Sequence, residues 1–85
     1  MAKVEIFTTK LCPYCYRAKA LLKDKGVAYR EVDVSFNPEM RRSLLERTGR
    51  RTVPQIFINE KSVGGYDDIA ALDEEGKLDE LLAAS

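Results

Sequence analysis

Two cysteines are the residues of this 85-residue chain best suited to covalent chemistry, and two residues, Pro13 and Tyr14, separate them. Proline is favoured in the first turn of a helix, so Cys12 is predicted to be an N-cap. There, free backbone N–H groups and the helix dipole favour an anion. Thiols in such settings have pKa values of about 3.5 to 7.5, and the thiolate is the nucleophile. We therefore assign attack to Cys12 and resolution to Cys15, which lies one turn into the helix.

The same spacing fits two other kinds of site. One is a structural disulfide, but closing so small a loop restrains the unfolded chain by only about 2 kcal/mol. The other is half of a metal site, which would need a second chain because zinc takes four ligands and this chain has no His. A position after a strand and at a helix start favours redox chemistry over both alternatives.

The composition excludes several classes of function. Without His, the chain cannot carry a Ser-His-Asp or Cys-His catalytic arrangement. Its 14 Lys+Arg balance 14 Asp+Glu, which argues against nucleic-acid and membrane-surface binding. No segment approaches the roughly 18 apolar residues of a membrane span, and no signal peptide is recognisable. We expect one domain, residues 1–85, that acts as a monomer in the cytoplasm.

The charges are unevenly distributed along the chain. Residues 1–51 hold 12 Lys/Arg and 6 Asp/Glu, whereas residues 52–85 hold 2 and 8. This asymmetry fits either an ordinary solvated surface or a dipolar molecule with a basic region around Cys12. In the second case Lys10 and Lys19 would add positive potential near the thiol.

Hydrophobic periodicity and turn residues predict the elements that position these groups. Strands are predicted over residues 4–7, 27–34, 55–58 and 61–63, and helices over residues 13–26, 37–49, 67–76 and 78–82. The first strand, helix and strand should form a right-handed parallel unit. The close third and fourth strands should form an antiparallel hairpin. The expected fold is therefore α/β, with a four-stranded mixed sheet and helices on its faces.

Three motifs together resemble the glutaredoxin family, and most of all its small bacterial forms with a dithiol Cys-Pro-Tyr-Cys site. They are residues 12–15 after the first strand, residues 52–54 before the third, and residues 64–68 at a helix start. Their order and separation over nearly the whole chain make the resemblance specific. It implies a thioredoxin-like fold, with glutathione as reductant and co-substrate and no metal.

The resemblance gives the second motif a role beside the nucleophile. Pro54 would follow a cis peptide bond and lie next to Cys12, although only about 5–6% of X–Pro bonds in folded proteins are cis. This bond would turn the backbone N–H and C=O of Val53 toward the cysteinyl part of glutathione, as a short added strand. Thr52, in the same motif, is also expected to bind glutathione. The alternative is an ordinary strand entry.

The third motif would hold the γ-glutamyl end of glutathione. Gly65 permits close backbone approach, the N–H groups of Tyr66 and Asp67 face the α-carboxylate, and Asp67 or Asp68 meets the ammonium. An acidic residue at a helix start is also commonly a cap. Tyr66 fits the core equally well, and Tyr14 is predicted to border the thiol groove or to be simply exposed.

The sequence differs from the family pattern at the position expected to supply a cation for the glycyl carboxylate of glutathione. Many relatives have Lys or Arg three residues before the first cysteine, where this chain has Thr9. The candidates here are Lys10, Arg41 and Arg51. Arg51 and its neighbour Arg50 are equally compatible with a solvated role.

The resemblance implies a glutathione-dependent thiol–disulfide oxidoreductase. Its substrates would be protein–glutathione mixed disulfides and protein disulfides, and the family pattern allows ribonucleotide reductase among them. One alternative is a homodimeric carrier of a glutathione-ligated [2Fe–2S] cluster, which Pro13 disfavours because it stiffens the loop. Another is a redoxin reduced by thioredoxin reductase, which the second and third motifs disfavour.

Overall fold

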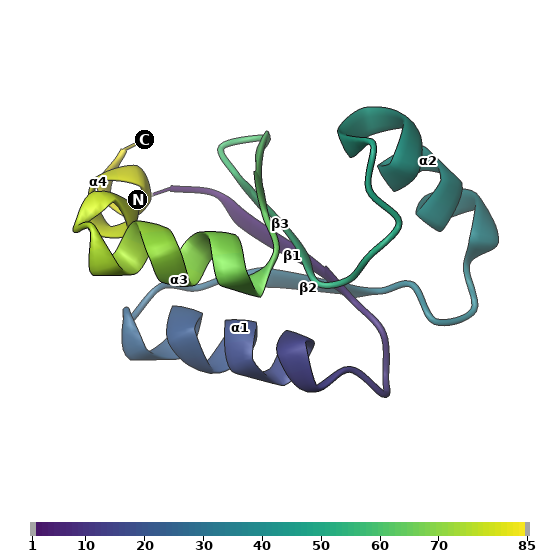
Figure 1. Cartoon of the computed structure of the whole chain (residues 1–85), viewed down its shortest axis with the longest axis horizontal. Coiled ribbons are helices and arrows are strands. Elements are labelled where there is room, and N and C mark those ends of the chain that lie inside the picture. The colour runs from purple at the N-terminus through teal and green to yellow at the C-terminus, as the bar shows by residue number, and fades with distance from the viewer. Residues whose placement is uncertain (1, 85) are drawn as a thin grey trace.

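The structure is a computed structural model that describes residues 2–84, and its elements follow the expected order (Figure 1). The strands are β1 (Val4–Thr8), β2 (Arg30–Asp33), β3 (Gln55–Ile58) and β4 (Lys61–Gly64). The helices are α1 (Pro13–Asp24), α2 (Pro38–Thr48), α3 (Tyr66–Glu74) and α4 (Lys77–Ala83). No helix in the described part of the chain is both long and apolar enough to cross a membrane.

The strands form one mixed sheet in the order β2-β1-β3-β4. β1 pairs in parallel with β2, and α1 provides the crossover that such a pair requires. β3 pairs antiparallel with both β1 and β4. The two-residue turn between β3 and β4 consists of Asn59 and Glu60, both with positive φ, as hairpin turns of this length favour.

Alternation along the central strands divides the core between the two faces of the sheet. Val4 and Ile6 of β1 point to one face, where they pack with residues of β3, α1, α3 and α4. Phe7 points to the other face and meets Phe57 edge to face, with ring centroids 5.6 Å apart, near Leu44 of α2. Figure 1 shows α1 and α3 side by side and α2 apart from them. The end of β1 that leads to Cys12 is thus held between two packed layers.

The second strand is shorter than predicted. It spans Arg30–Asp33 and not residues 27–34. The N–H of Val27 donates to the Leu22 carbonyl at 3.3 Å, so this residue completes the end of α1. Val27 and Tyr29 pack against the core before strand pairing begins. Apolar residues preceding β2 therefore extended the sequence pattern beyond the strand.

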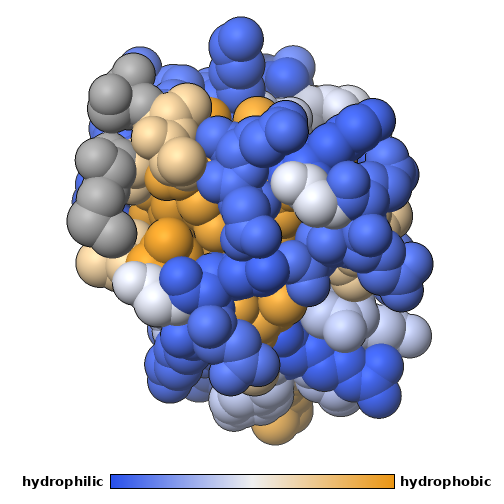
Figure 2. Space-filling model, turned by 90° about the vertical axis from the view of Figure 1, so that its left-hand side faces the viewer, coloured by the Kyte–Doolittle hydropathy of each residue, from blue (hydrophilic) through white to orange (hydrophobic). Residues whose placement is uncertain are grey.

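The two ends of the described chain meet beside the β3–β4 turn. The Lys3 N–H donates to Oδ1 of Asn59 at 2.9 Å, and Nδ2 of Asn59 donates to the Ala84 carbonyl at 3.2 Å. Figure 2 shows this end of the molecule, where apolar surface is visible between polar side chains. It lies away from the loop that carries Cys12.

Candidate functional site

Cys12 is the N-cap of α1, as predicted. Its backbone is extended, and its sulfur accepts a hydrogen bond from the Cys15 N–H at 3.1 Å. The sulfur also lies 3.7 Å from the carbonyl oxygen of Val53, to which the thiol donates. An N–H donor aimed at the sulfur stabilises negative charge there, because helix N-termini favour anions. Helix start and thiol are therefore arranged for nucleophilic attack.

Cys15 lies deeper than Cys12, with 1% of its surface exposed against 7%. Burial, followed by the hydrogen bond with Cys12, raises the pKa of the Cys15 thiol to about 12. At neutral pH Cys15 is therefore a protonated thiol, while Cys12 holds the position at the helix terminus. This division supports attack by Cys12 and resolution by Cys15.

Alkylation tests this division directly. At pH 7 we expect iodoacetamide to modify Cys12 in the reduced protein and to leave Cys15 intact, because a thiol with a pKa of about 12 is almost entirely protonated. Peptide mass spectrometry identifies the modified residue. The Cys12→Ser variant is the matched control and should remain unmodified, whereas alkylation of Cys15 in it would contradict the assignment.

The two lysines predicted near the thiol have other partners. The Lys19 ammonium pairs with the Glu31 carboxylate at 3.1 Å, and that carboxylate also accepts from the Thr8 hydroxyl at 2.8 Å. The Lys10 ammonium lies over the Phe36 ring, 5.3 Å from its centroid. Positive charge around Cys12 is thus partly neutralised, and the helix N-terminus remains the main stabilising feature.

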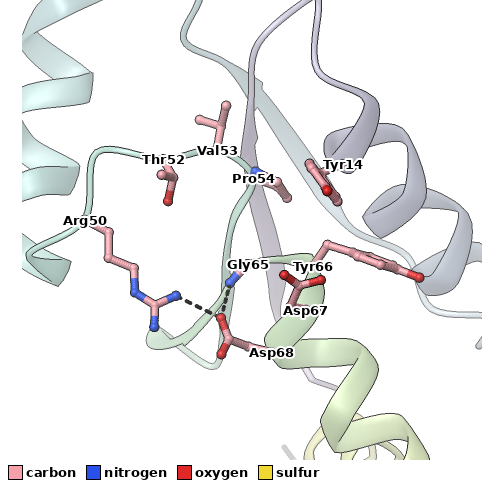
Figure 3. A pocket seen from close by; sticks show the side chains of 9 residues that line it. All are labelled: Tyr14, Arg50, Thr52, Val53, Pro54, Gly65, Tyr66, Asp67 and Asp68. Carbon is pink, nitrogen blue, oxygen red and sulfur yellow. Dashed lines mark hydrogen bonds and ion pairs between the residues drawn. The ribbon is translucent and has the colours of Figure 1, made fainter.

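The second motif lies against the nucleophile. The Val53–Pro54 peptide bond is cis, and Pro54 is buried. Gln55, the first residue of β3, donates from Nε2 to the Arg50 carbonyl at 2.8 Å and so holds the loop between them. In Figure 3 the side chains of Thr52 and Val53 point to opposite sides of this loop, and Val53 packs against the core under α2. The Val53 carbonyl is left facing Cys12.

A pocket of about 250 Å³ opens beside this loop (Figure 3). Its lining residues are Tyr14, Arg50, Thr52, Val53, Pro54, Gly65, Tyr66, Asp67 and Asp68. The second and third sequence motifs, separated along the chain, thus form one cavity. Cys12 does not line the pocket, but its thiol donates to the carbonyl oxygen of Val53, which is a lining residue.

The start of α3 is fixed by Asp68. Its Oδ2 accepts from the Gly65 N–H at 2.9 Å and from Nη1 of Arg50 at 2.8 Å. The Arg50 guanidinium, and then the Gly65 N–H, hold the pKa of this carboxyl below its ordinary value. The predicted capping role of an acidic residue here is confirmed, and it belongs to Asp68.

Glycines allow the start of α3 to approach its neighbours. Gly64 has φ +97, and a Cβ there would overlap the Asp68 side chain. A Cβ on Gly65 would come within 3.2 Å of the Pro54 carbonyl oxygen. The absence of side chains at both positions therefore brings the helix start up to the cis-proline loop.

The two tyrosines close the pocket on the α1 side. Tyr14 is half exposed, and its ring centroid lies 6.3 Å from that of Tyr66. Tyr66 packs against the main core and also lines the pocket, so both interpretations of this residue apply. Tyr14 borders the pocket and is exposed as well.

The structure does not bring the three predicted cations into this pocket. Lys10 and Arg41 line a separate groove, and Arg41 and Arg51 line another. Arg50, in contrast, lines the pocket, although its place in the sequence was equally compatible with a solvated residue. Arg50 lies two residues before the second motif, which is the one feature of the sequence that could have pointed to the pocket. Its contact with Asp68 is formed only in the folded chain.

Comparison with known proteins identifies the family. The family model described as Glutaredoxin matches residues 4–63. The chain belongs to the glutaredoxin family. It is 54% identical to Glutaredoxin 3 of Escherichia coli over 82 residues, which are 96% of this chain and 99% of that protein.

Solved glutaredoxin structures share the fold. The solution structure of glutaredoxin from Brucella melitensis matches with a TM-score of 0.87 and 56% identity, over 96% of this chain and 89% of that one. The buckwheat glutaredoxin–glutathione complex matches with a TM-score of 0.91 and 32% identity, over 95% and 76% of the respective chains. The α/β fold with its four-stranded mixed sheet is thus the thioredoxin-like fold, and glutaredoxins are thiol–disulfide oxidoreductases.

Proposed function

We propose that this glutaredoxin is a glutathione-dependent reductase of protein–glutathione mixed disulfides and protein disulfides. The observation that carries the proposal is the sulfur of Cys12, 3.7 Å from a backbone carbonyl that belongs to the wall of the pocket. A glutathionyl group in the pocket would present its sulfur to that thiol. The buckwheat relative, which forms a glutathione complex, supports this occupant.

The polar groups of the pocket suggest an orientation for glutathione. The backbone of Val53 would pair with the cysteinyl residue, and the first N–H groups of α3 would receive the γ-glutamyl carboxylate. The γ-glutamyl ammonium would meet Asp67, because Asp68 already binds Arg50 and Gly65. Within residues 2–84, Asp67 is exposed and its carboxylate has no hydrogen-bond or ion-pair partner.

The remaining carboxylate of glutathione requires a cation outside the pocket. Arg51 directly precedes Thr52, and it shares a groove with Arg41. We propose that Arg51 binds the glycyl carboxylate, with Arg41 beside it. Lys10 lies in the other groove, against the ring of Phe36, and is the less favourable candidate.

The proposed reaction with a mixed disulfide is two thiol–disulfide exchanges. The Cys12 thiolate attacks the glutathionyl sulfur, the disulfide bond breaks, and the protein leaves as a thiolate that takes a proton from water. A second glutathione thiolate then attacks the glutathionyl sulfur on Cys12. Oxidised glutathione leaves, and the Cys12 thiolate is restored. In the net reaction, one free glutathione and the mixed disulfide become the protein thiol and oxidised glutathione, so that one disulfide bond is exchanged for another.

With a protein disulfide, Cys12 would form a mixed disulfide that Cys15 resolves. Cys15 must lose its proton for this step, and its own surroundings allow the change. Two of the causes that raise its pKa are its hydrogen bond with Cys12 and the charge of Cys12. Both disappear once Cys12 is in a disulfide. Formation of the intermediate would therefore favour ionisation of the thiol that resolves it.

The choice of reducing system tests the proposal. The chain should reduce the mixed disulfide of glutathione and 2-mercaptoethanol when coupled to glutathione, glutathione reductase and NADPH. With thioredoxin reductase and NADPH in place of the glutathione system, turnover should be at least about tenfold lower, since that enzyme does not use the pocket. Equal turnover with both systems, or turnover with thioredoxin reductase alone, would contradict glutathione dependence.

A further inference from the structure

Exposed apolar side chains are concentrated around the nucleophile. Within residues 2–84, the large apolar and aromatic residues left exposed are Leu11, Tyr14, Tyr16 and Phe36. Three of them lie within four residues of Cys12, and Leu11 directly precedes it. Leu11 is 96% exposed and Phe36 is 86% exposed. Because removing such side chains from water is favourable, an exposed grouping of this kind is typical of a surface that another molecule covers.

The loops that carry Leu11 and Phe36 are held together by hydrogen bonds. The Lys10 N–H donates to Oγ of Ser35 at 2.9 Å, and the Val34 N–H donates to the Thr8 carbonyl at 2.8 Å. Between the loops is a groove of about 490 Å³, called here the Leu11–Phe36 groove. Its lining residues are Thr9, Lys10, Leu11, Ser35, Phe36 and Arg41. The apolar surface is therefore a built recess and not two unrelated side chains.

The charged residues that line this groove have one sign. Its charged lining residues are Lys10 and Arg41, and the adjoining groove on α2 adds Arg42 and Arg51. The nearby Asp33 carboxylate accepts from the Ser35 N–H at 2.8 Å and does not line either groove. Arg51 is assigned to glutathione with Arg41 beside it, which leaves Lys10 and Arg42 without a role in glutathione binding. An occupant with an apolar side chain and acidic neighbours would complement the groove.

We propose that the Leu11–Phe36 groove binds the protein substrate, through an apolar side chain and acidic residues that flank its glutathionylated cysteine. The inference rests on the proposed function. In that reaction the glutathionyl group fills the pocket near Asp68, so the protein must be held elsewhere. The groove adjoins Cys12 and shares no lining residue with the pocket. Substrate selection among proteins thus belongs to a surface separate from the pocket, although Arg41 lines both this groove and the groove proposed for the glycyl carboxylate of glutathione.

Three glutathionylated peptides test the proposal, each with one cysteine. The first has Leu and Glu beside the cysteine, the second has Leu and Lys, and the third has only Ser. The wild-type kcat/KM should be about tenfold higher for the first peptide than for the third, and the second should lie near the third. The advantage of the first peptide should fall between 50 and 500 mM salt, because exposed charges are screened.

The double variant Leu11→Ser, Phe36→Ser tests the groove itself. It should reduce the three peptides at nearly equal rates, while its turnover of the glutathione–2-mercaptoethanol mixed disulfide stays within about twofold of wild type. Lys61→Ser, an exposed substitution on β4, is the matched control and should keep the preference.

Two outcomes of the peptide assays would overturn the inference. One is that the wild type reduces all three peptides equally, and the other is that the double variant loses peptide turnover and small-substrate turnover to the same extent. A wild-type dimer that the double variant dissociates in sedimentation experiments would assign the groove to a second copy of this chain. Failure of the proposed function is distinguishable, because the wild type would then not reduce the small mixed disulfide at all.

Discussion

Replacing Cys12 by Ser is expected to lower glutathione-coupled turnover to less than about one-thousandth of wild type, for mixed disulfides and protein disulfides alike. A serine hydroxyl remains protonated at neutral pH even with the Cys15 N–H aimed at it, so the helix terminus has no thiolate to stabilise. Initial rates with the glutathione–2-mercaptoethanol mixed disulfide and with a protein disulfide measure the loss. Retained turnover of either substrate would remove Cys12 from the mechanism.

Cys15 variants are the matched comparison. Cys15→Ser and Cys15→Ala should keep reduction of the mixed disulfide, within about threefold, and lose direct reduction of protein disulfides. Two replacements are needed because Cys15 is only 1% exposed, and a buried hydroxyl can destabilise the protein where a methyl group does not. If both variants lost both activities while still folded, Cys15 would not act as a resolving thiol alone.

The parts of the fold that could be predicted are those with a local physical cause. Pro13 at a helix start and Cys12 before it predicted the N-cap. The helix predicted from residue 37 is capped by Asn37, whose Oδ1 accepts from the Met40 N–H at 3.0 Å. Short, mostly apolar runs predicted the buried central strands. The second strand was predicted too long because apolar residues that cover the end of a helix have the same pattern as residues in a strand.

The site was predicted in part, for a similar reason. Motif resemblance indicated Thr52, Val53 and the third motif, and these residues do line one pocket. The role of Arg50 could not be predicted, because its ion pair with Asp68 joins residues 18 positions apart, one in the loop after α2 and the other in the first turn of α3. Net charge could not show this contact either. The zero balance combines a basic half and an acidic half, and Arg50 and Asp68 are where the two halves meet at the pocket.

Asp68→Ala is expected to raise the KM for glutathione about tenfold and to leave kcat at saturating glutathione within about twofold. The carboxylate holds Arg50 and caps α3 through the Gly65 N–H, and both groups lie in the pocket wall. Without it the helix start and the Arg50 loop lose their common anchor, while Cys12 and its donor are untouched. Glutathione titrations in the coupled assay separate KM from kcat.

Asp68→Asn removes the charge of the carboxylate, and with it the ion pair to Arg50, but keeps a hydrogen-bond acceptor. The amide oxygen can still accept from the Gly65 N–H, so the free energy of unfolding should stay close to wild type, whereas Asp68→Ala should lose about 1 kcal/mol with the cap. The exposed ion pair with Arg50 adds only about 0.2–1 kcal/mol to stability. Arg50→Ala should therefore match Asp68→Asn in both unfolding free energy and KM for glutathione. The double variant Arg50→Ala, Asp68→Asn should have the same KM as either single variant.

The effect of pH on wild-type stability follows from the same contacts. The Arg50 guanidinium and the Gly65 N–H lower the pKa of Asp68, so the folded state holds this proton less tightly than the unfolded state. The resulting stabilisation is complete above the ordinary Asp pKa of about 3.9 and is lost as pH falls through the lower folded-state value. Asp68→Ala should lack this component of acid sensitivity in chemical unfolding curves.

Asp67→Ala completes the comparison, because Asp67 is proposed to bind the ammonium of glutathione without holding the fold. Its KM for glutathione should rise while its unfolding free energy stays within about 0.5 kcal/mol of wild type, as is usual for exposed substitutions. Asp68 is then a positioning residue and Asp67 a ligand-binding one. A KM change below twofold in Asp68→Ala, with the expected loss of stability, would show that the pocket does not depend on the Arg50–Asp68 anchor.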